Sequence, residues 1–196
     1  MRTLIGMALA LLAAGPLAGQ SIMRLTYTTS APVGATKDYI SEFSWLGIMF
    51  EPGKFVRDNL SAGLSFGWTV LDEKTDDPVQ IGDAVGAQGT QLRYLNVFPV
   101  MAGLQLHRQN PRGGSLYVGL NAGTYFIERR TDFSVVSAIE DNWHFGVAPQ
   151  LGVIFPLGYG RGHGNIDVRY HHAFEAGGHE YDWVSFSIGV AYGPRY

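Results

Sequence analysis

The sequence has 196 residues, a formal net charge of −3 and no cysteine. Its length suits one domain, its charge is too small to indicate a nucleic-acid partner, and no disulfide can brace the fold. Charged residues make up only 16% of the chain, against about 25% in globular proteins, while glycine occurs 26 times. This combination is common in membrane barrels, where small side chains must fit a narrow interior.

The N-terminal segment has the layout of a secretory signal peptide. A basic start and an apolar run over Leu4–Ala14 precede a helix-breaking Gly-Pro pair and the small pair Ala18-Gly19. We therefore predict a cleavable signal peptide over residues 1–20 and a mature domain over residues 21–196. The alternative, a membrane-anchoring helix, needs about 20 apolar residues, and this run is too short.

Later segments alternate large apolar residues with small or polar ones, as β-strands do. In residues 59–71, for example, Phe66 and Trp68 face one way while Ser65 and Gly67 face the other. No later run reaches the roughly 18 apolar residues of a transmembrane helix, so an exported chain that enters a membrane would do so as a barrel. In chain order, the predicted strands are residues 21–30, 43–54, 59–71, 91–107, 114–128, 142–157, 164–174 and 184–196.

The connections between the predicted strands alternate between long loops and tight turns. The long ones cover residues 31–42, 72–90, 129–141 and 175–182, and the others carry Asn, Gly and Pro. Bacterial outer-membrane barrels pair long outer loops with short periplasmic turns in this way. We therefore predict an all-β, eight-stranded antiparallel up-and-down transmembrane barrel in the bacterial outer membrane, with both termini in the periplasm.

The second long loop, residues 72–90, carries five acids and one lysine. We expect a solvated loop there. The alternative is a site for divalent cations that bridge lipopolysaccharide.

Aromatic residues collect at the predicted strand ends, as the two girdles of a membrane barrel require. We place the tryptophans Trp45, Trp68, Trp143 and Trp183 at the outer rim, and Tyr192 and Tyr196 at the periplasmic rim. The alternative is a soluble secreted barrel of lipocalin type, with the apolar face inside. The opposite face is mostly Gly, Ser and Ala, which suits a crowded lumen better than a water-exposed surface.

Three stretches resemble a family of small bacterial outer-membrane β-barrel proteins. They are the runs Tyr94–Pro99, Gly123–Asp132 and Glu140–Gly146, and the similarity spans about residues 21–196. The resemblance implies a small outer-membrane barrel and supplies no catalytic residue. The aromatic C-terminus also resembles the signal that the barrel-assembly machinery reads, although Pro194 departs from its usual pattern.

Several charged and histidine side chains share the predicted inner face. An eight-stranded barrel is just filled by its side chains, and a buried charge must be paired. We therefore predict a network of ion pairs and hydrogen bonds that plugs the lumen, and the alternative is a gated path for small solutes. The predicted members are Arg93, His144, Asp167, Arg169 and His171.

No pattern of residues establishes an enzyme or a metal site. A loop site formed by His172, Glu175 and His179 is possible, but we predict no metal and no cofactor. Ser137 and His179 are catalytic candidates only by elimination, because nothing in their spacing pairs them.

The sequence therefore favours a monomeric, non-enzymatic protein with a structural or surface-interaction role through its outer loops. We expect it to contact membrane lipid, lipopolysaccharide and, through its last strand, the barrel-assembly machinery. The alternatives are a narrow channel or conduit for small or hydrophobic solutes, and a lipid-modifying enzyme such as a hydrolase or acyltransferase.

Overall fold

A computed structural model describes residues 20–75, 79–81, 85–87, 91–111, 113–133, 136–158 and 160–193. The predicted signal peptide lies outside the described residues except for Gln20, and Pro194 and Tyr196 lie outside them as well.

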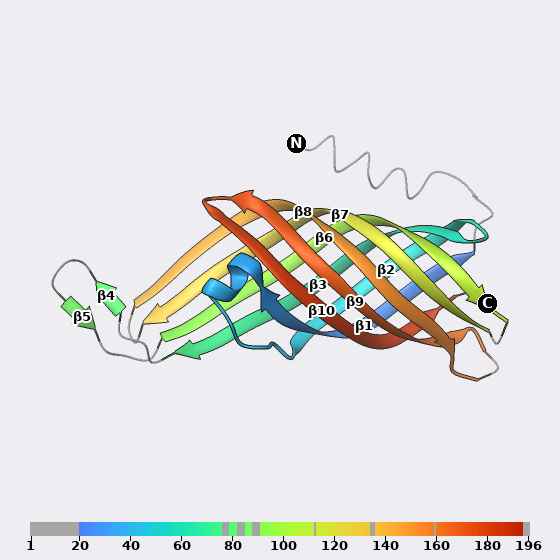
Figure 1. Cartoon of the computed structure of the whole chain (residues 1–196), viewed down its shortest axis with the longest axis horizontal. Coiled ribbons are helices and arrows are strands. Elements are labelled where there is room, and N and C mark those ends of the chain that lie inside the picture. The colour runs from blue at the N-terminus through green and yellow to red at the C-terminus, as the bar shows by residue number, and fades with distance from the viewer. Residues whose placement is uncertain are drawn as a thin grey trace.

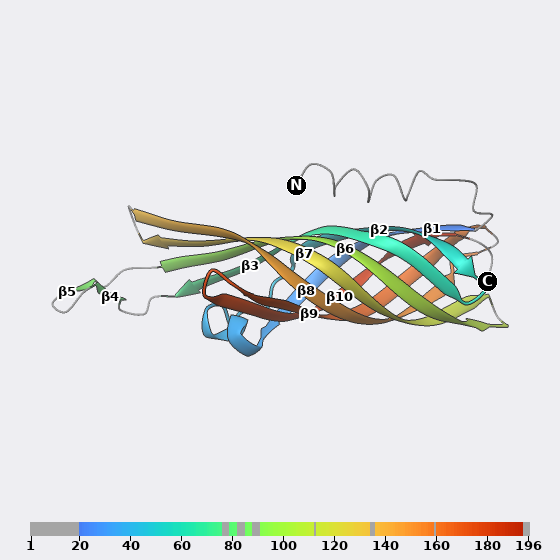
Figure 2. The ribbon, with the colours of Figure 1, turned by 90° about the horizontal axis from the view of Figure 1, so that it is seen from above.

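Eight antiparallel strands form a closed barrel in the order β1-β10-β9-β8-β7-β6-β3-β2 (Figures 1 and 2), which confirms the predicted fold. A short hairpin, β4 (Val79–Ile81) with β5 (Val85–Ala87), and a 3-10 helix, η1 (Gly34–Asp38), lie outside the ring. Within the described part of the chain, no helix is long and apolar enough to span a membrane. The barrel strands are β1 (Ser21–Val33), β2 (Leu46–Arg57), β3 (Leu60–Thr75), β6 (Gln91–Asn110), β7 (Gly114–Phe133), β8 (Val136–Pro156), β9 (Gly162–Ala176) and β10 (His179–Tyr192).

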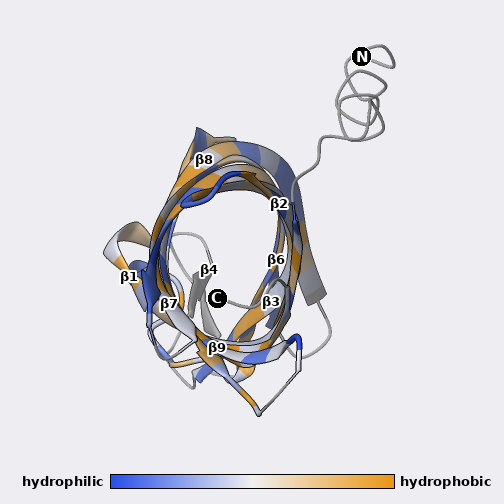
Figure 3. Ribbon diagram, turned by 90° about the vertical axis from the view of Figure 1, so that its right-hand side faces the viewer, coloured by the Kyte–Doolittle hydropathy of each residue, from blue (hydrophilic) through white to orange (hydrophobic). Residues whose placement is uncertain are grey.

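The first and last strands close the ring. β1 pairs with β10 from Met23 opposite Tyr192 to Val33 opposite Asp182, so the C-terminal strand meets the N-terminal one as the sequence predicts. Seen along its axis, the barrel is a continuous ring (Figure 3).

The alternation of side chains produces an apolar outer surface. In β1, Met23 and Leu25 are exposed while Arg24 between them is buried, and the other strands repeat the pattern. A surface of this kind would aggregate in water, whereas in a bilayer it is the lipid-facing belt of a barrel. The members of this apolar belt on other strands include Ile48, Phe50, Phe66, Val100, Leu104, Val118, Leu120, Leu151, Val153, Ile166, Val168, Phe186 and Ile188.

Two of the predicted outer loops are strands instead. β7 runs to Phe133 and β8 starts at Val136, so the predicted loop over residues 129–141 is wrong. The predicted loop over residues 175–182 shrinks to a turn at Gly177 and Gly178, whose φ angles of 63° and 81° favour glycine. These strand ends rise above the apolar belt and carry polar residues on both faces, so they show no apolar alternation.

The acidic loop predicted over residues 72–90 is described only in part. Residues 72–75 belong to β3, and β4 and β5 occupy part of the remainder. Residues 76–78, 82–84 and 88–90 lie outside the described part of the chain, and the predicted solvated loop and its cation-binding alternative fall largely on them.

The strands on one side of the barrel are longer than those on the other. β6, β7 and β8 have 20, 20 and 21 residues, against 13 in β1 and 14 in β10. About 9–11 residues cross the hydrocarbon layer. The surplus, together with the end of β3, forms a sheet that projects beyond the barrel mouth (Figure 1).

Candidate functional site

The middle of the lumen is organised around one carboxylate. Glu51 of β2 accepts from Arg169 of β9 at 2.5 Å, lies 3.2 Å from Nε of Arg24 in β1, and also accepts from the Ser65 hydroxyl at 3.0 Å. All three ionic side chains are almost fully buried. Because an unpaired buried charge is costly, a carboxylate shared by two guanidinium groups suits this position.

Amide and phenol groups continue this network across the lumen. Tyr117 donates to Asn165 at 3.0 Å, and Asn165 donates to the Asp167 carboxylate at 2.8 Å. On the other side, Gln150 donates to the Tyr117 hydroxyl at 3.3 Å and accepts from Asn121 at 3.0 Å. These bonds connect β7, β8 and β9 through side chains alone.

The network leaves little free space at this level. A cavity beside it measures about 10 Å³, which is room for about one water molecule. Glycine makes this filling possible, since a Cβ at Gly152 would overlap the Tyr117 ring. Residues that line the cavity include Arg24, Glu51, Ser65, Gln105 and Asn121.

Nearer the outer mouth, the lumen becomes aromatic and apolar. The His171 ring bonds to the hydroxyls of Tyr125 at 2.9 Å and Ser185 at 3.0 Å, and it stacks on Trp183 with centroids 4.5 Å apart. His144 donates from Nδ1 to the carbonyl of Phe174 at 3.0 Å.

The first outer loop closes the mouth from above. Ile40, which follows η1, is fully buried in a cluster with Leu71, Leu95, Tyr125 and Trp183. We call the segment from Gly34 to Glu42 the cap.

Polar contacts hold the cap to the barrel wall. The Tyr39 hydroxyl donates to the carbonyl of Arg130 at 2.9 Å, and the Arg129 guanidinium lies 3.9 Å from the centre of the Tyr39 ring. The Glu73 carboxylate accepts from the backbone N–H of Ser41, from the Ser41 hydroxyl at 2.9 Å and from the backbone N–H of Glu42 at 3.2 Å. Burial raises the pKa of Glu73, but these hydrogen bonds outweigh it and hold the pKa below its ordinary value.

The structure separates the predicted lumen residues into three groups. Asp167 and Arg169 lie in the central network, and His144 and His171 lie in the upper layer. Arg93 belongs to neither, because its guanidinium donates to the carbonyl of Tyr39 at 3.0 Å and so contacts the cap.

One predicted interface aromatic lies in the wrong place. Trp183 is 1% exposed and faces the lumen, so its placement at the lipid surface is wrong. The outward residues of β10 are Phe186 and Ile188, and the alternation turns Trp183 inward. The structure leaves Trp45, Trp68, Trp143 and Tyr192 exposed on the outside.

The alternative metal and catalytic residues have other partners. The His172 ring lies 2.7 Å from Asp182, and the His179 ring accepts a hydrogen bond from Arg129 at 2.8 Å. Among the described residues, no three potential metal ligands gather at one point. Ser137 lies opposite Asp132 of β7 in the strand pairing.

Sequence reasoning missed the centre of the network. Arg24 and Glu51 stand at inward positions of their strands, between Met23 and Leu25 and after Phe50. The alternation of apolar neighbours therefore marks both charges as lumenal, and that signal was sufficient to find them.

No protein-family model matches the sequence, and no curated protein sequence matches it. Several solved structures do match the fold of this chain. OprG from Pseudomonas aeruginosa matches with a TM-score of 0.54 at 15% identity over 91% of this chain and 97% of its own. The fold is that of small outer-membrane β-barrels.

Two further structures share this fold. Neisserial surface protein A matches with a TM-score of 0.53 at 10% identity, over 89% of this chain and 96% of its own. Ail, the attachment invasion locus protein of Yersinia pestis, in complex with the heparin analogue sucrose octasulfate, matches with a TM-score of 0.52 at 14% identity, over 90% of this chain and 99% of its own.

Proposed function

We propose that this chain is a monomeric, non-enzymatic protein of the bacterial outer membrane that acts through its outer surface. Its barrel anchors that surface and does not conduct. The observation that carries the proposal is the Glu51 carboxylate shared by Arg24 and Arg169, because it fills the lumen with paired charge.

The outer end supplies the interaction surface in this proposal. The projecting ends of β3, β6, β7 and β8 stand beyond the apolar belt (Figure 1). Ail, the attachment invasion locus protein with the same fold, was crystallised with the heparin analogue sucrose octasulfate. Acids outnumber cations among the described residues at the outer end of this chain, so we expect a partner with basic groups rather than a sulfated one.

The remaining partners follow from the fold. The apolar belt contacts membrane lipid, and we propose contacts of the outer rim with lipopolysaccharide and of the last strand with the barrel-assembly machinery.

Planar-bilayer recording tests the closed lumen. The wild-type barrel should give no conductance steps, whereas Glu51→Ala should give them by removing the shared carboxylate. Steady wild-type conductance would contradict the proposal. Neutralisation of Glu140 and Asp141, on the projecting end of β8, should weaken binding of a basic cell-surface partner while the heat-modifiable gel mobility of the barrel persists.

A second candidate function is a conduit for small or hydrophobic solutes. Between β8 and β9, pairing passes from Val147 opposite His172 to Gln150 opposite Arg169, with no described pair between them. Pro149 lies in this gap and has no N–H to donate. Uptake of a hydrophobic dye into vesicles that depends on the protein would favour this function.

A lipid-modifying enzyme is the third candidate. Overexpression should leave the masses of lipid A and phospholipids unchanged if the protein is not an enzyme. A new lipid species that disappears in Ser137→Ala or His179→Ala would establish the enzyme instead.

A further inference from the structure

The two ends of the barrel carry opposite charge. At the end where β1 begins and β10 ends, the described cations outnumber the one described acid, Asp58, whereas acids dominate the other end. The described cations at this basic end are Lys54, Arg57, Arg108 and Arg161.

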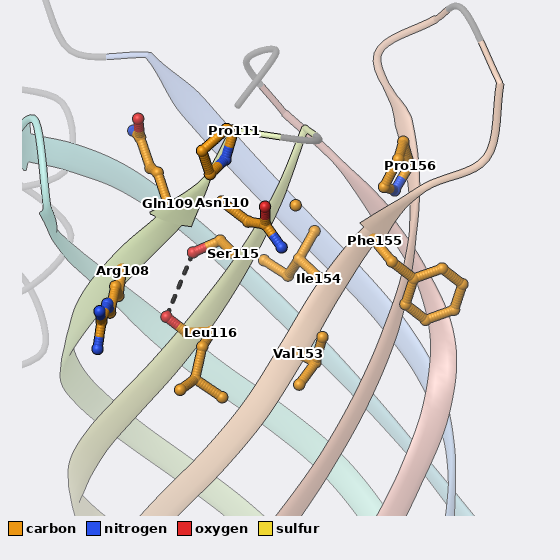
Figure 4. A pocket seen from close by; sticks show the side chains of 11 residues that line it. Arg108, Gln109, Asn110, Pro111, Ser115, Leu116, Val153, Ile154, Phe155 and Pro156 are labelled. Atoms are coloured by element: carbon orange, nitrogen blue, oxygen red, sulfur yellow. Dashed lines mark hydrogen bonds between the residues drawn. The ribbon is translucent and has the colours of Figure 1, made fainter.

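A surface groove of about 490 Å³ lies at this basic end, between the β6–β7 turn and the end of β8 (Figure 4). Its lining includes three apolar side chains, Leu116, Val153 and Phe155, which are 46%, 44% and 37% exposed. They belong to the outward face of β7 and β8, so the groove is continuous with the apolar belt.

The strand ends account for the groove. Pairing of β7 with β8 begins at Ser115 opposite Ile154, so Gly114 and Phe155 are not paired with each other. Gly114 adds no side chain to the groove. The Phe155 ring rests against Gly164 of β9, where a Cβ would overlap it. The ring therefore lies on the β9 side of β8, away from the boundary between β7 and β8.

Arg108 supplies a cation at the aqueous end of the groove. It follows Leu106 on the outward face of β6 and lies just beyond the apolar belt. Its guanidinium makes no ion pair with a described residue. A cation beside an apolar wall at this depth matches a lipid whose phosphate lies at the membrane surface.

We propose that this groove binds an anionic glycerophospholipid of the periplasmic leaflet. Its acyl chain lies along Leu116 and Val153, and its phosphate contacts Arg108. The proposal rests on the membrane orientation proposed above, and it holds whether or not the lumen conducts.

Native mass spectrometry of the full chain in detergent tests this site, with phosphatidylglycerol and phosphatidylcholine as probes. The wild type should retain phosphatidylglycerol in preference, and Arg108→Gln should lower that affinity about fivefold. Arg161→Gln is the matched control, because it removes a rim charge outside the groove. Val153→Trp should fill the groove and weaken retention of both lipids.

Heat-modifiable gel mobility shows that each variant is folded. Equal losses in Arg108→Gln and Arg161→Gln would overturn the proposal in favour of diffuse attraction to the rim. Displacement of the lipid by inorganic phosphate, or preferential retention of lipid A, would overturn it as well. Conductance of the wild type would contradict the proposed closed lumen, but it would not affect the preference for phosphatidylglycerol or its dependence on Arg108.

Discussion

Two layers of the lumen are closed by different means. In the middle, Arg24, Glu51 and Arg169 come from strands, and the two guanidinium groups share one carboxylate. Nearer the mouth, Ile40 comes from a loop and fills an apolar cluster that includes Trp183. The central layer is therefore part of the barrel, whereas the upper layer can open without breaking a strand.

The largest loss of stability should come from a substitution in the central layer. Glu51→Ala leaves two buried guanidinium groups without their carboxylate and should lower the free energy of unfolding by about 3–5 kcal/mol. Urea unfolding in lipid vesicles measures the loss. Asp167→Asn is the comparison. The Asp167 carboxylate accepts a hydrogen bond from Asn165, and its replacement should lower the free energy of unfolding by only about 1 kcal/mol. Equal losses of unfolding free energy in the two variants would contradict the conclusion that the central layer depends on Glu51.

A smaller loss of stability, confined to the cap, should follow from a substitution in the upper layer. Ile40→Ala removes apolar contacts from the cap and should destabilise its closed position by about 2 kcal/mol. Hydrogen exchange of the Tyr39 and Ile40 amides, which both donate to the Thr36 carbonyl, reports this opening. Lys37→Ala changes an exposed residue of the same segment and should leave the exchange unchanged. Faster exchange throughout the strands would show that the cap is not a separate layer.

The smallest effect concerns the attachment of the cap to Glu73. The folded pKa of this carboxyl lies below its unfolded value, so its contribution is present above the unfolded pKa and is lost as the pH falls through the folded one. The Ser41 amide signal in NMR spectra should therefore titrate at acidic pH. In Glu73→Gln this titration should disappear, and its persistence would assign the change to another group.

The fold was predictable because the apolar alternation repeats in every membrane-spanning strand. The strand ends above the belt were not, since charged residues such as Arg129, Arg130 and Glu140 occupy both faces there and leave no apolar period. In the lumen, the alternation identifies which residues face inward but not which of them meet. Arg24, Glu51 and Arg169 come together only through the stagger of three strands around the ring.

The closing pair of strands has a consequence for folding. Arg169 and Glu51 are 118 residues apart in the sequence, and the contact between them forms only when the last strands join the first. A barrel that has inserted its early strands therefore holds Glu51 and Arg24 without the second guanidinium. Until the ring closes, the Arg169 guanidinium lacks this carboxylate, and an unpaired charge inside the membrane is costly, so insertion and closure should occur as one cooperative event.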